Sequence, residues 1–204
     1  MKKSAFICIV TVVVMLNFLL QKNDTLGYFV EDATSSLVVK VTWFGLVCAP
    51  LLYLVGTIDK WQNGSYLNQL VRTDKLHRIV ISTYFINLFH VLGIVLIGLL
   101  INALLTGNTG SIENILNLVG SYMFYTSVYM VLELLFSSTS AVLSLCALLL
   151  IVALGKNNLS LLGSITFHRN TSIYQTILTL FMTITIMTFF LKKLNQKDFY
   201  GKGI

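Results

Sequence analysis

Long runs of apolar residues, separated by short polar stretches, dominate the pattern along the chain. A helix that crosses a membrane needs about 20 mostly apolar residues, and six stretches come close to that length or exceed it. They cover, approximately, residues 4–20, 37–57, 79–105, 115–136, 141–154 and 173–191. The pattern therefore predicts an all-α, polytopic membrane protein with six transmembrane helices in a single domain over residues 1–204.

The border between the fourth and fifth stretches depends on one polar run, Ser137-Ser138-Thr139-Ser140. Ser and Thr side chains bond to nearby backbone groups and can end a helix. A single helix of about 40 residues would also be about twice as long as a membrane is thick. We therefore expect two separate helices here.

The first stretch has the charge pattern of a signal peptide, because Lys2 and Lys3 precede an apolar run. No cleavage site of the A-x-A type follows this run. We therefore expect residues 4–20 to be a retained span.

Composition supports a membrane protein. Hydrophobic residues make up 56% of the chain and charged residues 11%, whereas soluble domains carry about 25% charged residues. This excludes a soluble enzyme, and it also excludes a nucleic-acid-binding domain in spite of the net charge of +6. The three cysteines lie inside apolar runs without paired spacing, so neither a disulfide framework nor a metal site is expected.

The basic residues predict an orientation, because cytoplasmic loops of membrane proteins carry an excess of Lys and Arg. With six spans, ten of the 14 basic residues fall on the side of the N-terminus. These ten are Lys2, Lys3, Lys60, Arg72, Lys75, Arg78, Lys192, Lys193, Lys197 and Lys202. Both termini are therefore expected in the cytoplasm of a cell, with the protein as a multi-pass component of its membrane.

The largest inner loop, between the second and third spans, contains a short amphipathic pattern. Its apolar positions Tyr66, Leu67, Leu70 and Val71 share one helical face. Gly64 and Ser65 precede them, and Ser65 is a suitable N-cap. The spacing predicts a helix over about residues 64–72 along the inner membrane surface. A helix that only rests in the interface would have the same pattern.

This loop resembles the cytoplasmic coupling segment of type-2 ABC exporter permeases. The residues that fit the family pattern are Gly64, Ser65, Leu67, Leu70, Val71, Arg72 and Lys75. The family often has a proline after the coupling helix, where this chain has Thr73-Asp74.

Two further segments resemble the same family. The chain ends its last span with basic residues, followed by Lys197-Asp198-Phe199, similar to the family's short charged tail. The segment over about residues 158–168 is too apolar for an ordinary loop and too short to span. In the family, the equivalent segment forms outer re-entrant helices over the substrate path.

The resemblance implies a permease subunit for a peptide or a hydrophobic antimicrobial compound. It implies a second permease subunit, the same or related, and a separate cytoplasmic ATPase that carries ATP and Mg²⁺. This chain has no G-x-x-x-x-G-K-[ST] phosphate loop and is expected to bind no cofactor directly. Membrane lipid is the remaining expected partner, and nucleic acid is not one.

Polar side chains inside spans are candidates for a substrate path, because they are costly in lipid. The candidates are Tyr122, Tyr125 and Tyr129 on one face of the fourth span, Asn87 and His90 in the third, and Glu133 near the inner end of the fourth. Each also has a structural interpretation. Glu133 could reach water or a basic partner, and an intramembrane histidine often bonds a neighbouring helix.

Two features are expected to shape the helices themselves. Pro50 should kink the second span. Thr176, Thr179 and Thr183 share a face of the sixth span that suits close helix packing.

No known intramembrane enzyme pattern is present in the sequence, because His-Glu-x-x-His and paired intramembrane carboxylates are both missing. The alternative to a permease is therefore another non-enzyme, a stand-alone membrane immunity or sensor protein that binds a partner without transport.

Overall fold

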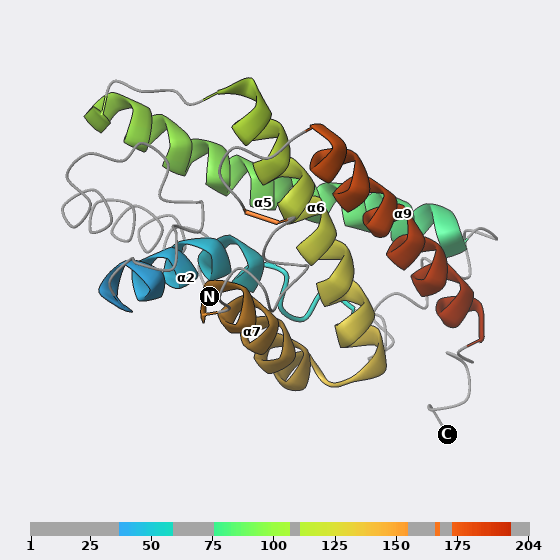
Figure 1. Cartoon of the computed structure of the whole chain (residues 1–204). Helices are drawn as coiled ribbons and strands as arrows, with labels where there is room; N and C mark the ends of the chain where they lie inside the picture. The colour runs from blue at the N-terminus through green and yellow to red at the C-terminus, as the bar shows by residue number, and fades with distance from the viewer. Residues whose placement is uncertain (1–36, 59–75, 107–110, 155–165, 168–172, 197–204) are drawn as a thin grey trace.

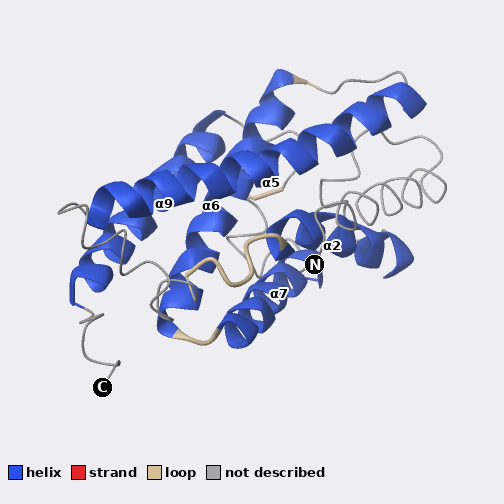
Figure 2. Ribbon diagram, turned by 180° about the vertical axis from the view of Figure 1, so that it is seen from behind, coloured by secondary structure: helices blue, strands red, loops and turns tan. Residues whose placement is uncertain are grey.

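The described part of the chain is helical. The computed structural model describes residues 37–58, 76–106, 111–154, 166–167 and 173–196. Its five helices, shown in Figure 1 and from behind in Figure 2, are α2 (Leu37–Leu52), α5 (Leu76–Thr106), α6 (Ile112–Leu135), α7 (Ser138–Leu154) and α9 (Ile173–Gln196). The predicted first span and the predicted coupling helix, with all its residues from Gly64 to Lys75, lie outside the described residues.

Three of these helices are long and apolar enough to cross a membrane. Their apolar segments are Arg78–Ile101, Ile112–Leu135 and Ile173–Lys193. α2 and α7 contain shorter apolar segments, Trp43–Leu52 and Ser138–Val152. The fold is thus that of an all-helical protein with three candidate membrane spans.

Helix α6 lies at the centre of the bundle and contacts α5, α7 and α9, while α2 packs on α5 and α7. One apolar cluster joins Ile58, which follows α2, to the start of α5 and to the ends of α6 and α9. Successive described helices therefore run in alternating directions, as in a chain that crosses a layer repeatedly (Figure 1).

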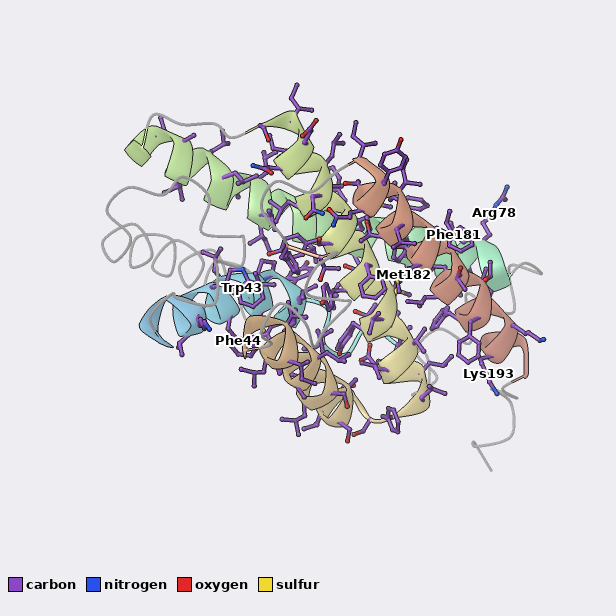
Figure 3. The ribbon with its side chains drawn as sticks, viewed as in Figure 1. Trp43, Phe44, Arg78, Phe181, Met182 and Lys193 are labelled. Carbon is purple, nitrogen blue, oxygen red and sulfur yellow. The ribbon has the colours of Figure 1, made fainter. Side chains whose placement is uncertain are left out.

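We call the end of the bundle that contains Ile58, Arg78 and Lys193 the basic end. Arg78, Lys192 and Lys193 all lie there, and Figure 3 shows Arg78 and Lys193 on the same side of the molecule. At the opposite end, the described charged residues are Lys40 in α2 and Glu113 in the first turn of α6, which have opposite charges.

Serine side chains define the ends of α6 and α7. Ser111 is the N-cap of α6, and its hydroxyl accepts a hydrogen bond from the Asn114 amide at 3.3 Å. Phe136 leaves the helix in an extended conformation, and the Ser137 hydroxyl then accepts from the Ser140 amide at 3.4 Å in the first turn of α7. The two helices are separate, with the break at Phe136 and Ser137, where the polar run begins.

The end of α2 differs from the expectation. The sequence predicted a span to residue 57 with a kink at Pro50. In the structure, α2 ends at Leu52, and Pro50 lies in its last turn. Tighter turns come next, in which the Tyr53 amide donates to the Pro50 carbonyl at 3.2 Å, and Gly56 adopts a positive φ of 78°. Proline has no amide hydrogen to donate within a helix. Here α2 ends shortly after Pro50 and does not continue as a kinked helix.

The predicted threonine face of α9 packs closely against α6, as its small side chains suggested. Thr179 and Thr183 are buried. A Cβ atom at Gly120 of α6 would lie 3.0 Å from the Thr179 Oγ1 and 3.8 Å from the Thr176 Cγ2. Glycine at position 120 therefore permits the close approach of the two helices.

Gly120→Ala is expected to lower the free energy of unfolding by about 1–3 kcal/mol, the usual cost of overpacking. Thr179 cannot move away cheaply, because its hydroxyl donates to the Thr176 carbonyl at 2.8 Å. Gly93→Ala is the matched control, since a Cβ atom at Gly93 would meet no atom within 4 Å and alanine favours a helix by about 1 kcal/mol. Thermal unfolding in detergent compares the two. Equal effects would contradict close packing at Gly120.

Candidate functional site

The six polar candidates do not form one site in the structure. They fall into three places: the middle of α6, the basic end, and one side of α5. Each place joins elements that are far apart in the sequence.

In the middle of α6, aromatic side chains surround Phe167. The Phe167 ring stacks on Tyr125 with a centroid distance of 5.5 Å. It meets the rings of Tyr122 and Trp43 edge to face, at 5.3 Å and 5.9 Å. We call Trp43, Tyr122 and Tyr125 the aromatic cage. Trp43 comes from α2 (Figure 3), so the cage joins two helices around one ring.

Side-chain hydroxyls hold the backbone at Phe167. The Phe167 amide donates to the Ser121 Oγ at 3.0 Å, and the Ser121 hydroxyl donates in turn to the Asn117 carbonyl at 2.8 Å. The Tyr125 hydroxyl lies 3.2 Å from the Thr166 Oγ1. Phe167 has a φ of 55°, in the left-handed region that is a strained conformation for a bulky residue.

Thr166 and Phe167 lie at membrane depth if α6 spans the bilayer. Ser121 is about 14 Å along the axis from the first residue of α6 at 1.5 Å per residue. The short orange segment beside α6 in Figure 1 is this part of the chain. Non-helical backbone at such depth must be covered by protein or face a cavity, and Phe167 has an exposed fraction of 0%. These are the only described residues of the predicted re-entrant segment.

The tyrosine face of α6 points into the protein. Tyr122, Tyr125 and Tyr129 are all buried. Phe167 covers the first two, so a substrate path along this face would require Phe167 to move.

At the basic end, Glu133 connects three elements. Its Oε2 accepts a hydrogen bond from the Ile58 amide at 3.0 Å, and its Oε1 accepts from the Ser138 hydroxyl at 2.9 Å. Its exposed fraction is 1%. The side chain therefore connects the segment after α2 to the turn between α6 and α7. The water or basic partner that the sequence suggested for Glu133 stays a prediction.

On α5, His90 contacts the turn after α2. Its ring stacks on Tyr53 with a centroid distance of 5.2 Å. Its Nδ1 lies 2.7 Å from the Ile86 carbonyl and must carry the proton there, because a carbonyl oxygen only accepts. Asn87 is buried, and its Nδ2 has no hydrogen-bond partner among the described residues.

The described residues contain no group of three or more His, Cys, Asp and Glu side chains able to hold a metal ion. What this part of the chain offers is therefore hydroxyls, aromatic rings and one buried carboxyl group. Such groups recognise a ligand by packing and hydrogen bonds.

The chain matches no protein-family model, no curated protein and no solved structure. No family is assigned by comparison. The function must therefore be argued from the residues and their geometry.

Sequence reasoning missed several residues that the geometry brings forward. These are Trp43, Ser121, Thr166, Phe167 and Gly120. The apolar character of residues 158–168 marked this segment as unusual, and its two described residues, Thr166 and Phe167, are buried. Their partners on α2 and α6 are set by tertiary packing and leave no local pattern.

Proposed function

We propose that this chain is the membrane subunit of an ATP-driven ABC transporter that exports a peptide or a hydrophobic antimicrobial compound. It pairs with a second permease subunit, the same or related, and with a separate cytoplasmic ATPase that binds ATP and Mg²⁺. The observation that carries the proposal is the buried, non-helical Thr166–Phe167 segment inside the helical bundle. These two residues belong to the segment over about residues 158–168, which corresponds to the outer re-entrant helices over the substrate path of such permeases.

The proposal includes six spans, with both termini in the cytoplasm of a bacterial cell. The charge of the described residues supports this orientation, because Arg78, Lys192 and Lys193 lie at the basic end, whereas Lys40 and Glu113 are the described charged residues at the opposite end. Under the positive-inside rule, the basic end would face the cytoplasm.

Cysteine labelling tests this orientation, in a variant whose three native cysteines are replaced by alanine. Glu113→Cys is expected to react with a membrane-impermeant maleimide on intact cells, because Glu113 is exposed at the end opposite the basic end. Lys193→Cys, also exposed, should react only after permeabilisation. The reverse pattern would invert the topology and remove the predicted coupling helix from the cytoplasm.

The position of Ile58 supports the coupling role of the inner loop. Glu133 accepts a hydrogen bond from the amide of Ile58, the first residue of this loop. A coupling helix needs a firm connection to the spans, since it transmits the movement of an ATPase to them. The Glu133 contacts join that connection to α6 and α7 together.

A pull-down tests the proposal directly. The tagged protein is isolated from its native cells in mild detergent, and the bound proteins are identified by mass spectrometry. A stoichiometric P-loop ATPase is the expected result. Recovery of the chain alone, or with a non-ATPase partner, would favour a stand-alone immunity or sensor protein.

Polar substitutions at Leu67, Leu70 and Val71 are expected to reduce the stimulation of the partner ATPase at least tenfold. These residues are predicted to share the apolar face of the coupling helix that would enter the ATPase. Asn68→Ser and Gln69→Ser are matched controls in the same segment, because both positions lie off that face. ATP hydrolysis by the isolated complex is the measurement. Equal losses in both sets would show that the apolar face has no special role.

A further inference from the structure

We propose that the aromatic cage is a binding site for an aromatic residue of a peptide, and that Phe167 occupies this site when no cargo is bound. The cage is formed by Trp43, Tyr122 and Tyr125. The inference rests on the proposed function only in calling the peptide a cargo. The binding site itself can be tested without an ATPase.

The contacts of Phe167 define the ligand, because Phe167 is itself an aromatic residue of a peptide chain. Its ring has one stacked and two edge-to-face neighbours, which are the preferred arrangements of aromatic pairs. Its backbone amide donates to the Ser121 hydroxyl at 3.0 Å. The site thus recognises a ring and an amide N–H together, at the spacing they have in one phenylalanine residue.

A second hydroxyl extends the recognition to the neighbouring residue. The Tyr125 hydroxyl lies 3.2 Å from the Thr166 Oγ1. A peptide bound in the place of Phe167 would meet this hydroxyl beside the cage. The Ser121 hydroxyl keeps its bond to the Asn117 carbonyl in either case, so its oxygen is available to accept from the amide of Phe167 or from that of a peptide.

The conformation of Phe167 favours exchange. Its φ of 55° lies in the left-handed region, and such strained residues occur in ligand clamps and switch regions. A free peptide can place a ring in the same cage with an ordinary negative φ. The incoming residue then makes the same contacts without the strain that the chain carries at position 167.

The aromatic cage lies on the face of α6 that is the candidate substrate path. Tyr122 and Tyr125 belong to the buried tyrosine face of α6. Their covering residue belongs to the non-helical segment rather than to a helix. Exchange of Phe167 for a peptide residue would therefore expose this face without separating α2 from α6.

The first test measures whether a peptide mimic displaces the segment. In the full chain with its native cysteines replaced by alanine, Thr166→Cys reports exposure of position 166, which is buried. Saturating N-acetyl-phenylalaninamide is expected to raise the rate of maleimide labelling about tenfold. N-acetyl-alaninamide should leave it unchanged. Glu113→Cys, exposed on the same helix as the cage tyrosines, should label at one rate under all conditions. An unchanged labelling rate of the Thr166→Cys variant with both compounds would overturn the proposal.

The second test removes the internal ligand. Phe167→Gly is expected to bind N-acetyl-phenylalaninamide at least tenfold more tightly than the wild type in equilibrium dialysis, because the competing ring is gone. Adding Ser121→Ala should reverse most of this gain in affinity, since the amide of the bound probe then loses its acceptor. An apolar cavity without specific recognition would bind the probe equally with and without Ser121, and that result would overturn the proposal.

The outcomes separate this inference from the proposed function. If the probe binds but no partner ATPase is found, the binding site is supported and the transporter function is contradicted. If a partner ATPase is found but the probe has no effect, the transporter function is supported and the binding site is contradicted.

Discussion

Phe167→Ala is expected to lower the free energy of unfolding by about 3–5 kcal/mol, as for other buried Phe-to-Ala changes. The ring is fully buried and packs on three aromatic side chains. Phe167→Gly should lose about 1 kcal/mol less than Phe167→Ala, because glycine adopts the left-handed conformation without a Cβ clash. Thermal unfolding in detergent measures both.

Phe181 is the matched control. It lies within α9 (Figure 3), and its exposed fraction is 66%. The free energy of unfolding of Phe181→Ala is expected within about 0.5 kcal/mol of the wild type. That of Phe181→Gly should be about 1 kcal/mol lower than that of Phe181→Ala, because glycine destabilises the interior of a helix relative to alanine. The preference for glycine or alanine thus reverses between positions 167 and 181. The same order at both would show that Phe167 does not have a left-handed backbone.

Glu133→Ala is expected to lower the free energy of unfolding by about 3 kcal/mol, since each buried donor left without a partner costs about 1–3 kcal/mol. The Ile58 amide and the Ser138 hydroxyl both lose their acceptor. Glu133→Gln should lose nearly as much, because its NH₂ group would face one of the two donors. Thermal unfolding gives the size of the effect, and hydrogen exchange of the Ile58 amide gives its location.

Glu113→Gln provides the control on the same helix. Glu113 is exposed in the first turn of α6, so its change is expected within about 0.5 kcal/mol of the wild type. Faster exchange at Ile58 only in the Glu133 variants would confirm the connection. Unchanged exchange in Glu133→Ala would mean that other contacts hold the segment after α2.

The parts of the fold that depend on local pattern could be predicted from the sequence. Apolar runs placed α5, α6 and α9 within a few residues, because length and hydropathy decide such helices. Polar side chains at the end of α6 indicated the break before α7. The spacing of the threonines in α9 indicated a packing face, although nothing identified Gly120 as its partner.

Long-range contacts could not be predicted in this way. Glu133 was recognised as unusual, but its bond to Ile58 spans 75 residues of sequence. Pro50 suggested a kink, and whether a chain bends or turns at a proline depends on how the next residues pack. The left-handed backbone of Phe167 has no local signal, because a left-handed phenylalanine persists only where the surrounding packing holds it.

The length of α5 has a consequence for a bilayer around the protein. At 1.5 Å per residue, the described part of α5 measures about 46 Å, whereas the hydrocarbon core of a bilayer is about 30 Å thick. A helix of this length that crosses a bilayer must tilt or project beyond its surface. A thinner bilayer is therefore expected to increase the tilt of α5 relative to the membrane normal, and a thicker bilayer to reduce it.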